Sequence, residues 1–552
     1  MNRRPWLWGF FACLLIAGCG PAETGTTTSS GGTGGTGGAG GTGGTPATGG
    51  TGGGVDPRFD ALIAAVEAER EELGAPGVAV AVIEDGEVTF ARGFGSKDPS
   101  ADVPVEATTL FRIGSVNKML TAAGLLVQVG KGTIDLDAPV TDYVPDFQFD
   151  ADPEWAPSIR GEHLLTHSSG MSDYLEIDVP LSQQTDEALE TFMTGQFGSV
   201  DYLMAPAGTF YNYSNPNFYM AGLLAEKATG KPYRQVMKDD VFGPLGMDRT
   251  FFLASEVLAD GDYALGKSGN FPGIPDVVHP DTYENAWARP AGYASSSVLD
   301  LAKFVRFLLD GDDAVLPKSL VDDMQSPRVN TLEYGDLVHY GYGLTVLDGV
   351  FLGGPDKFHA MKVVQHGGDI PGFAALVAYV PGLRFGFIAL ANADGARFTK
   401  SWVTALTTLA ELPAPSAPPD LEPDPATFSL MEGTYQDDYN VGTITVTKVG
   451  EDLEVSMPLV DQAGIPYEPV LTPYAPNGFL LGIQGTTLPV TFIPDETGAY
   501  RYFRTRAFVG IRPSAPPPPA PSLIGERRTR FLDAVRRAGP AAAELLLPAR
   551  PR

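Results

Sequence analysis

The chain contains little cysteine and little positive charge for its length. Two cysteines occur among its 552 residues, Cys13 and Cys19, and both lie close to the N-terminus. A folded domain further along therefore has no internal disulfide, so its hydrophobic core must hold it together, and a hydrophobic content of 43% is ample for that. Lysine and arginine number 38 against 67 aspartate and glutamate residues, which gives a net charge of −29. This balance argues against nucleic acid as a partner, because a phosphate backbone binds basic surfaces.

The apolar run at the N-terminus, residues 6–17, is too short to span a membrane. Two arginines precede it, a pattern typical of a signal peptide. The run ends in Ile16-Ala-Gly-Cys19, which resembles the bacterial lipoprotein box, where the chain is cleaved before the cysteine and the thiol receives a lipid. The resemblance predicts a signal peptide over 1–18 and export. It also predicts a lipid anchor on Cys19 that holds the protein in the bacterial cell envelope, on the periplasmic or outer-membrane side. An ordinary signal peptide that happens to contain a cysteine is the alternative.

Composition divides the rest of the chain into segments. Glycine, threonine and proline tracts predict flexible or extended connections, and the more apolar stretches between them predict folded domains. The predicted segments are a lipidated cysteine with a Gly/Thr-rich tether over 19–55, a first folded domain over 56–411, a Pro-rich linker over 412–425, a small β domain over 426–512, and a Pro-rich spacer with a basic tail over 513–552. We expect the basic tail to be frayed, with contact to an anionic membrane surface or to the acidic body of the protein as the alternative.

The first folded domain has the pattern of an α+β fold. An apolar stripe at helical spacing over 59–73 is followed by an apolar run over 77–83, Asp85-Gly86 and Val88-Thr-Phe90, which predict a hairpin with Asp-Gly as its turn. A long helical middle, strands over 376–380 and 385–390, and an apolar helix over 402–409 complete it. We therefore predict an antiparallel sheet flanked by helices. After the linker, short alternating runs separated by turn residues predict a small all-β, barrel-like domain.

Ser115-Val-Asn-Lys118 is the first candidate for chemistry. It follows a turn and opens an apolar helix that runs through Val129. Positions i and i+3 share one helical face, so Lys118 can lie beside the Ser115 hydroxyl. A serine hydroxyl becomes a good nucleophile when a base takes its proton, and lysine can do so if burial lowers its pKa. The alternative for this tetrad alone is a surface helix with a serine cap and a solvated lysine.

Tyr213-Ser-Asn215 is the second candidate. It lies in a polar, aromatic loop, residues 208–216, just before a helical run. A phenol there can carry a proton between nucleophile and leaving group, as a general acid and base must. Asn215 would point its amide toward the substrate. The alternative is a capped helix start with a packed tyrosine.

His366-Gly-Gly-Asp369 is the third candidate, just before the predicted strand over 373–380. Gly367 and Gly368 would let a ligand approach a sheet edge closely. A backbone N–H of Asp369, together with that of Ser115, would form an oxyanion hole. A simple β-turn is the alternative.

Taken together, Ser115-Val-Asn-Lys118, Tyr213-Ser-Asn215 and His366-Gly-Gly368 resemble the three motifs of the β-lactamase-related, penicillin-recognising serine hydrolases. That family includes class C β-lactamases, D-alanyl-D-alanine carboxypeptidases, D-aminopeptidases and esterases. The resemblance covers about residues 56–410 and implies an antiparallel sheet between an all-helical subdomain and terminal helices. It implies that Ser115 is acylated, that Lys118 is its basic partner, that Tyr213 moves the proton, and that His366 is the third-motif side chain. It implies no metal and no organic cofactor.

One departure bears on the substrate. Many members have lysine where this chain has His366, and a fixed ammonium holds the carboxylate of a β-lactam or of a D-Ala terminus. Histidine is mostly neutral near pH 7. The departure favours small esters or D-amino-acid amides and peptides of the cell envelope as substrates. Hydrolysis of β-lactams, or a catalytically silent protein used for binding or scaffolding in the envelope, are the alternatives. The sequence leaves the oligomeric state open.

Overall fold

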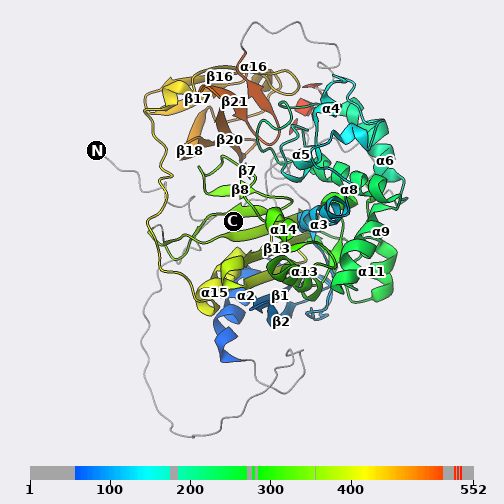
Figure 1. The fold of residues 1–552 in the computed structure, drawn as a ribbon. Helices are drawn as coiled ribbons and strands as arrows, with labels where there is room; N and C mark the ends of the chain where they lie inside the picture. Colours follow the sequence, from blue (N-terminus) through cyan, green and yellow to red (C-terminus); the bar gives the residue numbers. More distant parts are fainter. Residues whose placement is uncertain are drawn as a thin grey trace, which may run out of the picture.

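The computed structural model describes residues 56–173, 184–269, 276–279, 284–354 and 356–513, with residues 528–529, 531–533 and 535–536 of the tail. The predicted signal peptide, Cys19 and the tether lie outside the described residues. Figure 1 shows a central sheet with helices on its faces, a helical region beside it, and a separate barrel above the far end of the sheet. Within the described ranges, no helix has both the length and the apolar character that crossing a membrane requires.

The sheet has eight strands in the order β2-β1-β14-β13-β12-β9-β8-β7, and every neighbouring pair is antiparallel. The predicted hairpin is confirmed, with Asp85 and Gly86 both in the left-handed region that a tight turn requires. The strands are β1 (Gly77–Glu84), β2 (Glu87–Gly95), β7 (Val329–Asn330), β8 (Val338–Tyr340), β9 (Thr345–Leu347), β12 (Val363–Ile370), β13 (Phe373–Val380) and β14 (Phe385–Ala391).

Strand β1 shows how the sequence builds two layers. Its side chains alternate between the faces of the sheet, as the two-residue period of a strand requires. The three valines at 78, 80 and 82 join the core beneath α2 (Asp60–Glu72) and α15 (Thr399–Leu409). On the other face, Ala79, Ala81 and Ile83 join the opposite core, where α13 (Val298–Asp310) packs. The predicted antiparallel sheet flanked by helices is thus confirmed.

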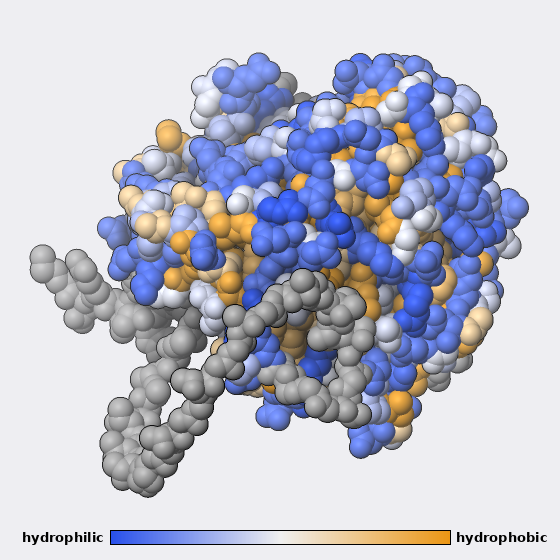
Figure 2. Space-filling view, turned by 60° about the horizontal axis from the view of Figure 1, so that its bottom comes forward, coloured by the Kyte–Doolittle hydropathy of each residue, from blue (hydrophilic) through white to orange (hydrophobic). Residues whose placement is uncertain are grey.

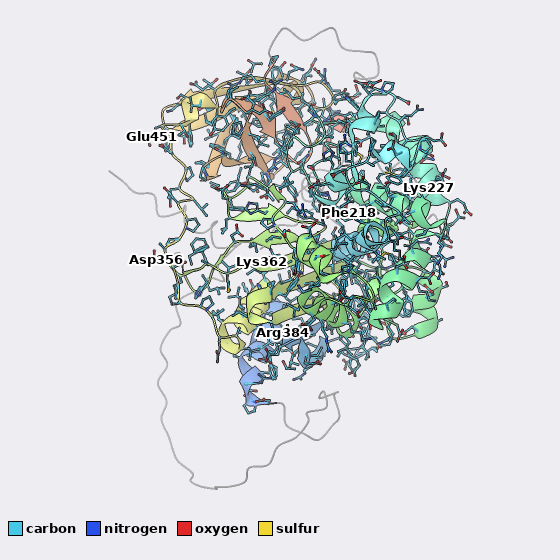
Figure 3. The ribbon with its side chains drawn as sticks, in the orientation of Figure 1. Phe218, Lys227, Asp356, Lys362, Arg384 and Glu451 are labelled. Atoms are coloured by element: carbon cyan, nitrogen blue, oxygen red, sulfur yellow. The ribbon has the colours of Figure 1, made fainter. Side chains whose placement is uncertain are left out.

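The helical subdomain is built around α3 (Asn117–Gly130). Every residue of α3 from Asn117 to Gln128 is buried, so this helix runs through the core and is apolar on nearly all sides. In Figure 3, Phe218 of α8 (Asn215–Thr229) lies inside the molecule, whereas Lys227 of the same helix lies at the periphery. The other helices around them are α4 (Trp155–Ser158), α5 (Gly161–Leu165), α6 (Ala188–Phe192), α9 (Tyr233–Met237), α11 (Ala254–Asp260), α12 (Arg289–Gly292) and α14 (Lys318–Met324).

The third motif lies within a strand, not in a turn before one. Residues His366 to Asp369 belong to β12 and pair with β13, Gly368 opposite Ala375 and Asp369 opposite Ala374. On its other side β12 pairs with β9 over residues 363–365, and the residues that follow run along the turn that carries Ser115. The glycine-rich half of β12 therefore faces the start of α3 and not another strand.

A closed barrel of eight antiparallel strands follows the linker, which confirms the predicted small β domain. Pairing of Gln436 with Ile511 closes it. Its core is aromatic, with Phe492 against the rings of Tyr435, Phe479 and Phe503. The strands are β15 (Gly433–Asp437), β16 (Gly442–Val449), β17 (Asp452–Ser456), β18 (Val470–Ala475), β19 (Gly478–Ile483), β20 (Thr486–Pro494), β21 (Tyr500–Arg504) and β22 (Val509–Ile511), with one helix, α16 (Pro458–Gln462).

The described part of the basic tail contacts the barrel, which corrects the expectation of a frayed tail for these residues. Phe531 is buried in the barrel core, and the Arg536 guanidinium donates to the Ala463 carbonyl at 2.9 Å. Leu532 and Val535 also pack against the barrel core, so apolar side chains hold this segment on the barrel.

An apolar and aromatic interface joins the barrel to the helical subdomain. Tyr202 and Tyr439 stack with ring centroids 3.9 Å apart, and Phe210 meets Tyr502 edge to face at 5.0 Å. The outer surface is different: the face in Figure 2 is mostly hydrophilic, with scattered hydrophobic residues. The barrel is thus fixed against the rest of the protein by buried contacts.

Candidate active site

Ser115 and Lys118 come together where a sharp turn enters α3. Gly114 has a φ of 51°, in the left-handed region that glycine adopts without strain, and it places Ser115 in a short 3-10 turn directly before the helix. Ser115 stays partly exposed. Lys118, one helical turn on, is fully buried, with its Nζ 3.0 Å from the Ser115 Oγ. The structure therefore brings the two residues of the first motif into hydrogen-bond contact.

Two further oxygens surround the amine of Lys118. The Asn215 Oδ1 lies 2.7 Å from Nζ and the Ala291 carbonyl oxygen lies 2.9 Å from it. Burial lowers the pKa of Lys118 well below its usual value; the Asp173 carboxylate opposes this and the Arg506 guanidinium adds to it. Lysine at this position is therefore prepared to act as a neutral amine.

Asn215 is held at both ends by protein groups. Its amide oxygen accepts from Lys118, and its amide nitrogen lies 3.2 Å from the Asp173 Oδ1, which also accepts from the Asn215 backbone N–H at 2.9 Å. Because a carboxylate can only accept, Asp173 fixes which end of the amide faces Lys118. The side chain thus orients the amine of Lys118.

Tyr213 lies over the nucleophile from the second motif. Its hydroxyl shares a hydrogen bond with Ser115, and burial raises the pKa of Tyr213 to about 12, so the phenol is protonated at neutral pH. The Lys118 Nζ lies 4.9 Å from the centre of its ring, and the Arg506 guanidinium carbon lies 4.7 Å from it. The buried ring of His167 lies 4.3 Å from the Tyr213 ring. The Lys118 amine, the Arg506 guanidinium and the His167 ring therefore surround the Tyr213 ring.

Arg506 reaches this site from the barrel. It follows β21, and its guanidinium binds Asp173, with Nε 2.8 Å from Oδ2 and a second contact through one terminal nitrogen. Both side chains are almost completely buried, at 11% and 5% exposure. Sequence reasoning missed Arg506, Asp173 and His167 as site residues. A signal existed for the last two, because they lie in or beside the stretch His163 to Gly170, but nothing in the sequence marked Arg506.

His366 occupies the third motif as a neutral imidazole. Its Nδ1 lies 2.6 Å from the Gly367 carbonyl oxygen, which can only accept, so Nδ1 carries the proton. Its Nε2 then accepts from the Tyr340 hydroxyl at 3.0 Å. Burial lowers the pKa of His366 to about 3, and the Lys118 amine contributes to this. The third motif thus presents no fixed positive charge from His366.

The backbone of β12 lies against the nucleophile. A Cβ added to Gly368 would collide with the Ile113 carbonyl oxygen and lie 3.1 Å from the Ser115 nitrogen. A Cβ added to Gly114 would lie 2.7 Å from the Asp369 nitrogen. The Asp369 side chain turns away to bind Arg397, with Nε 2.6 Å from Oδ2. The turn that carries Ser115 and the strand segment that carries Asp369 are therefore packed closely against each other.

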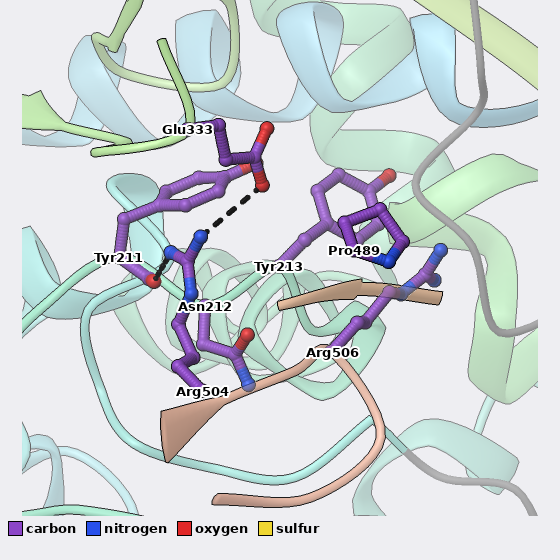
Figure 4. Close-up of a pocket in the computed structure, with 7 residues that line it drawn as sticks. All are labelled: Tyr211, Asn212, Tyr213, Glu333, Pro489, Arg504 and Arg506. Atoms are coloured by element: carbon purple, nitrogen blue, oxygen red, sulfur yellow. Dashed lines mark hydrogen bonds and ion pairs between the residues drawn. The ribbon is translucent and has the colours of Figure 1, made fainter. Parts of the chain in front are cut away.

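A pocket opens beside Tyr213, between the helical subdomain and the barrel (Figure 4). Glu333 projects into it toward Arg504, with 3.3 Å between oxygen and nitrogen, and Arg504 also donates to the Tyr211 carbonyl oxygen at 2.6 Å. The lining residues are Tyr211, Asn212, Tyr213, Glu333, Pro489, Arg504 and Arg506. Side chains of the barrel thus form one wall next to the site. Within the described ranges, no group of histidine, cysteine, aspartate and glutamate side chains is arranged to hold a metal ion.

Known proteins resemble this chain in sequence and in fold. A D-aminopeptidase of Gluconobacter oxydans is 28% identical over 340 residues, which is 60% of this chain and 58% of the relative. The chain thus spans about three fifths of the length of the first curated relatives it matches. An octameric penicillin-binding protein homologue of Pyrococcus abyssi has a TM-score of 0.54 at 25% identity, covering 79% of this chain and 96% of that one. A D-stereospecific amidohydrolase of Streptomyces sp. has a TM-score of 0.51 at 25% identity, covering 63% and 98%.

The model of the family described as beta-lactamase matches residues 62–408. This range is more than half of the chain, and it contains the sheet, the helical subdomain and all three motifs. The chain belongs to the beta-lactamase family.

Proposed function

We propose that this protein is a serine hydrolase that forms an acyl-enzyme on Ser115 and releases it with water. One observation carries the proposal: the fully buried amine of Lys118 lies 3.0 Å from the Ser115 Oγ. The substrates we propose are small amides, peptides or esters, in particular those with a D-amino acid on the acyl side.

The contacts of Lys118 support its role as the base. A neutral amine has two N–H groups and one lone pair. The Asn215 amide oxygen and the Ala291 carbonyl oxygen can only accept, so they take both N–H groups. The lone pair then points at Ser115 and accepts its proton as the oxygen attacks the substrate carbonyl carbon.

Two other groups would complete the first half of the reaction. The N–H groups of Ser115 and Asp369 would stabilise the negative oxygen of the tetrahedral intermediate. The protonated phenol of Tyr213, hydrogen-bonded to Ser115, would give its proton to the departing nitrogen or oxygen. The ammonium formed on Lys118 returns a proton to Tyr213. In the second half, water takes the place of the leaving group, and the same proton transfers run in reverse.

The substrate class rests on two supports. The first support is that proteins similar to this chain are named D-aminopeptidase and D-stereospecific amidohydrolase, names that point to substrates of D configuration. His366 is neutral and uses both ring nitrogens within the protein, so it offers no ammonium for a substrate carboxylate. This favours substrates without a free carboxylate next to the scissile bond over β-lactams.

The full chain and its Ser115→Ala variant would test the proposal. We expect hydrolysis of D-alanine p-nitroanilide faster than of the L form, and no hydrolysis by the variant. Intact mass after incubation with a penicillin adds a second readout. Rapid turnover of the penicillin with Ser115 present would make the protein a β-lactamase. No reaction with amides, esters or penicillin would support a binding or scaffolding protein instead.

We also propose that the protein is exported and held in the cell envelope by a lipid on Cys19. The support is the N-terminal sequence alone, with its arginines, apolar run and Ile16-Ala-Gly-Cys19. The mass of the N-terminal peptide of protein purified from bacterial membranes would test it. A diacylglyceryl-cysteine at position 19 is expected, and a free thiol there would contradict it.

A further inference from the structure

An unbroken series of hydrogen bonds connects the barrel to the nucleophile. The steps run from Arg506 to Asp173, from Asp173 to Asn215, from Asn215 to Lys118 and from Lys118 to Ser115. Arg506 is 333 residues away from Asp173 in the sequence, beyond the range that the family model matches. The barrel thus contributes a charged group to the site while lying outside the range that the family model matches.

The series has a fixed direction because each carboxylate or carbonyl oxygen in it can only accept. Arg506 holds one oxygen of Asp173, and the other oxygen receives both N–H donors of Asn215. The position of Asp173 therefore determines how Asn215 presents its oxygen to Lys118.

Asp173 also carries a charge that works against catalysis. A buried carboxylate near a lysine favours the protonated, cationic form of that lysine, which cannot act as a base. The Arg506 guanidinium, paired directly with the carboxylate, opposes this effect on the pKa of Lys118. The site thus keeps the structural use of Asp173 at a reduced electrostatic cost.

We propose that Arg506 is a positioning residue of this active site, an inference that rests on the function proposed above. By pairing with Asp173, it prevents that carboxylate from drawing a proton onto Lys118. The barrel is then a working part of the active site, since it supplies the counter-charge that keeps the base ready.

The other titratable groups that face Lys118 are neutral near pH 7. His167, from the turn after α5, and His366, on β12, are buried, and burial lowers the pKa of each. Tyr213, from the loop before α8, is protonated because its pKa is raised to about 12. The Arg397 guanidinium lowers the pKa of Tyr213 and of His366, and it is paired with Asp369. Among the described residues, Asp173 and Arg506 are therefore the charged pair that acts on the pKa of Lys118.

The experiment measures how fast a fluorophosphonate phosphonylates Ser115 in the full chain as pH varies, by intact mass. The acid limb of this profile reports deprotonation of Lys118. Arg506→Gln leaves Asp173 unopposed, so the limb is expected to move to higher pH, by about one unit or more. Asp173→Asn leaves Arg506 unopposed, so the limb is expected to move to lower pH. The double variant is expected to return close to the wild-type limb.

A matched control is Arg504→Gln, which removes another buried arginine of the barrel. Arg504 binds the Tyr211 and Thr331 carbonyl oxygens and Glu333, not Asp173, so the acid limb is expected to stay in place even if the rate falls. Arg506→Lys keeps the positive charge, so the acid limb of the profile is expected to stay at the same pH as in wild type.

The two proposals fail in different ways. Wild-type protein that is not phosphonylated at Ser115 would refute the proposed function. Wild-type protein that is labelled, with the same acid limb in Arg506→Gln, Asp173→Asn and wild type, would refute the role of Arg506 alone. If Arg506→Gln does not fold, Asp173→Asn tests the role of Arg506. An acid limb at lower pH than in wild type supports that role, and an unchanged limb refutes it.

Discussion

Lys118 approaches Ser115 from within the core, with its Nζ 3.0 Å from the serine Oγ and with none of its surface exposed. The lysine lies three residues beyond the serine, so the 3-10 turn and the start of α3 together fix the distance. A solvated lysine at the same spacing would be protonated at neutral pH and of no use as a base. Burial thus makes a basic partner out of a common pair of residues.

Replacing Ser115 with alanine is expected to abolish turnover of D-alanine p-nitroanilide, with a fall in kcat/KM of at least about a thousandfold, because no other nucleophile takes its place. The circular dichroism spectrum should stay unchanged, since the hydroxyl is partly exposed. Residual activity within tenfold of wild type would assign the chemistry to another residue.

Replacing Lys118 with methionine is expected to alter how stability depends on pH. The pKa of Lys118 is lowered in the folded protein, while the unfolded chain keeps a value of about 10.4. Below that value the unfolded state binds a proton that the folded state does not, so the amine costs the wild-type protein about 1.4 kcal/mol for each pH unit of decrease, until its folded pKa is reached. The free energy of unfolding of the methionine variant minus that of wild type should therefore be larger at pH 7 than at pH 9.

Urea unfolding of both proteins at pH 7 and pH 9 measures this difference. A constant difference between the two pH values would mean that Lys118 is protonated in the folded protein. Such a result would also remove the basis for its role as a base.

His366 is expected to stay neutral from pH 5 to pH 8, because its folded pKa is about 3. Its C2 proton resonance, assigned by its loss in His366→Gln, should not move over that range. The unfolded chain takes up a proton below about 6.5, so stability is lost as pH falls from there toward 3. The His366→Gln variant should lose less stability than wild type between pH 7 and pH 5. A titrating resonance with a midpoint near 6.5 would contradict this.

Gly368→Ala is expected to destabilise the protein by about 1–3 kcal/mol and to reduce activity more than stability alone explains. Its new methyl group would meet the Ile113 carbonyl oxygen and push β12 away from Ser115. Gly367→Ala is the matched control, because its methyl group would lie 3.6 Å from the flexible Arg397 side chain, an ordinary contact. Thermal unfolding and kcat/KM of both variants measure the difference. Equal effects of the two substitutions would show that β12 does not need to approach the nucleophile.

Local pattern was enough to predict much of the fold. The hairpin at Asp85-Gly86 has a turn sequence with a physical preference, and the continuous apolar run of β1 fits a strand that is buried on both faces. The apolar residues after Ser115 likewise predicted the helix α3, which the structure shows to be buried. These features depend on residues close together in the chain, so a single sequence is enough to predict them.

Other features depend on tertiary contacts that no local pattern reports. The segment from His366 to Asp369 has two glycines and little strand preference, yet pairing with β13 holds it as a strand. The spacing of Ser115 and Lys118 predicted their contact, whereas the contact of Asp173 with Arg506 joins two domains. The burial of Phe531 in the barrel also depends on the barrel being closed first.

Besides the contact of Arg506 with the site, the barrel also contacts the edge of the sheet. Strand β7 is the outermost of the eight, and the residue that follows it, Thr331, gives its carbonyl oxygen to Arg504 at 3.0 Å. Leu332 packs among the barrel residues of the same interface. An uncovered sheet edge invites pairing with another chain, whereas a closed barrel has no edge of its own. We therefore predict that a chain ending at residue 411 self-associates, which light scattering would detect.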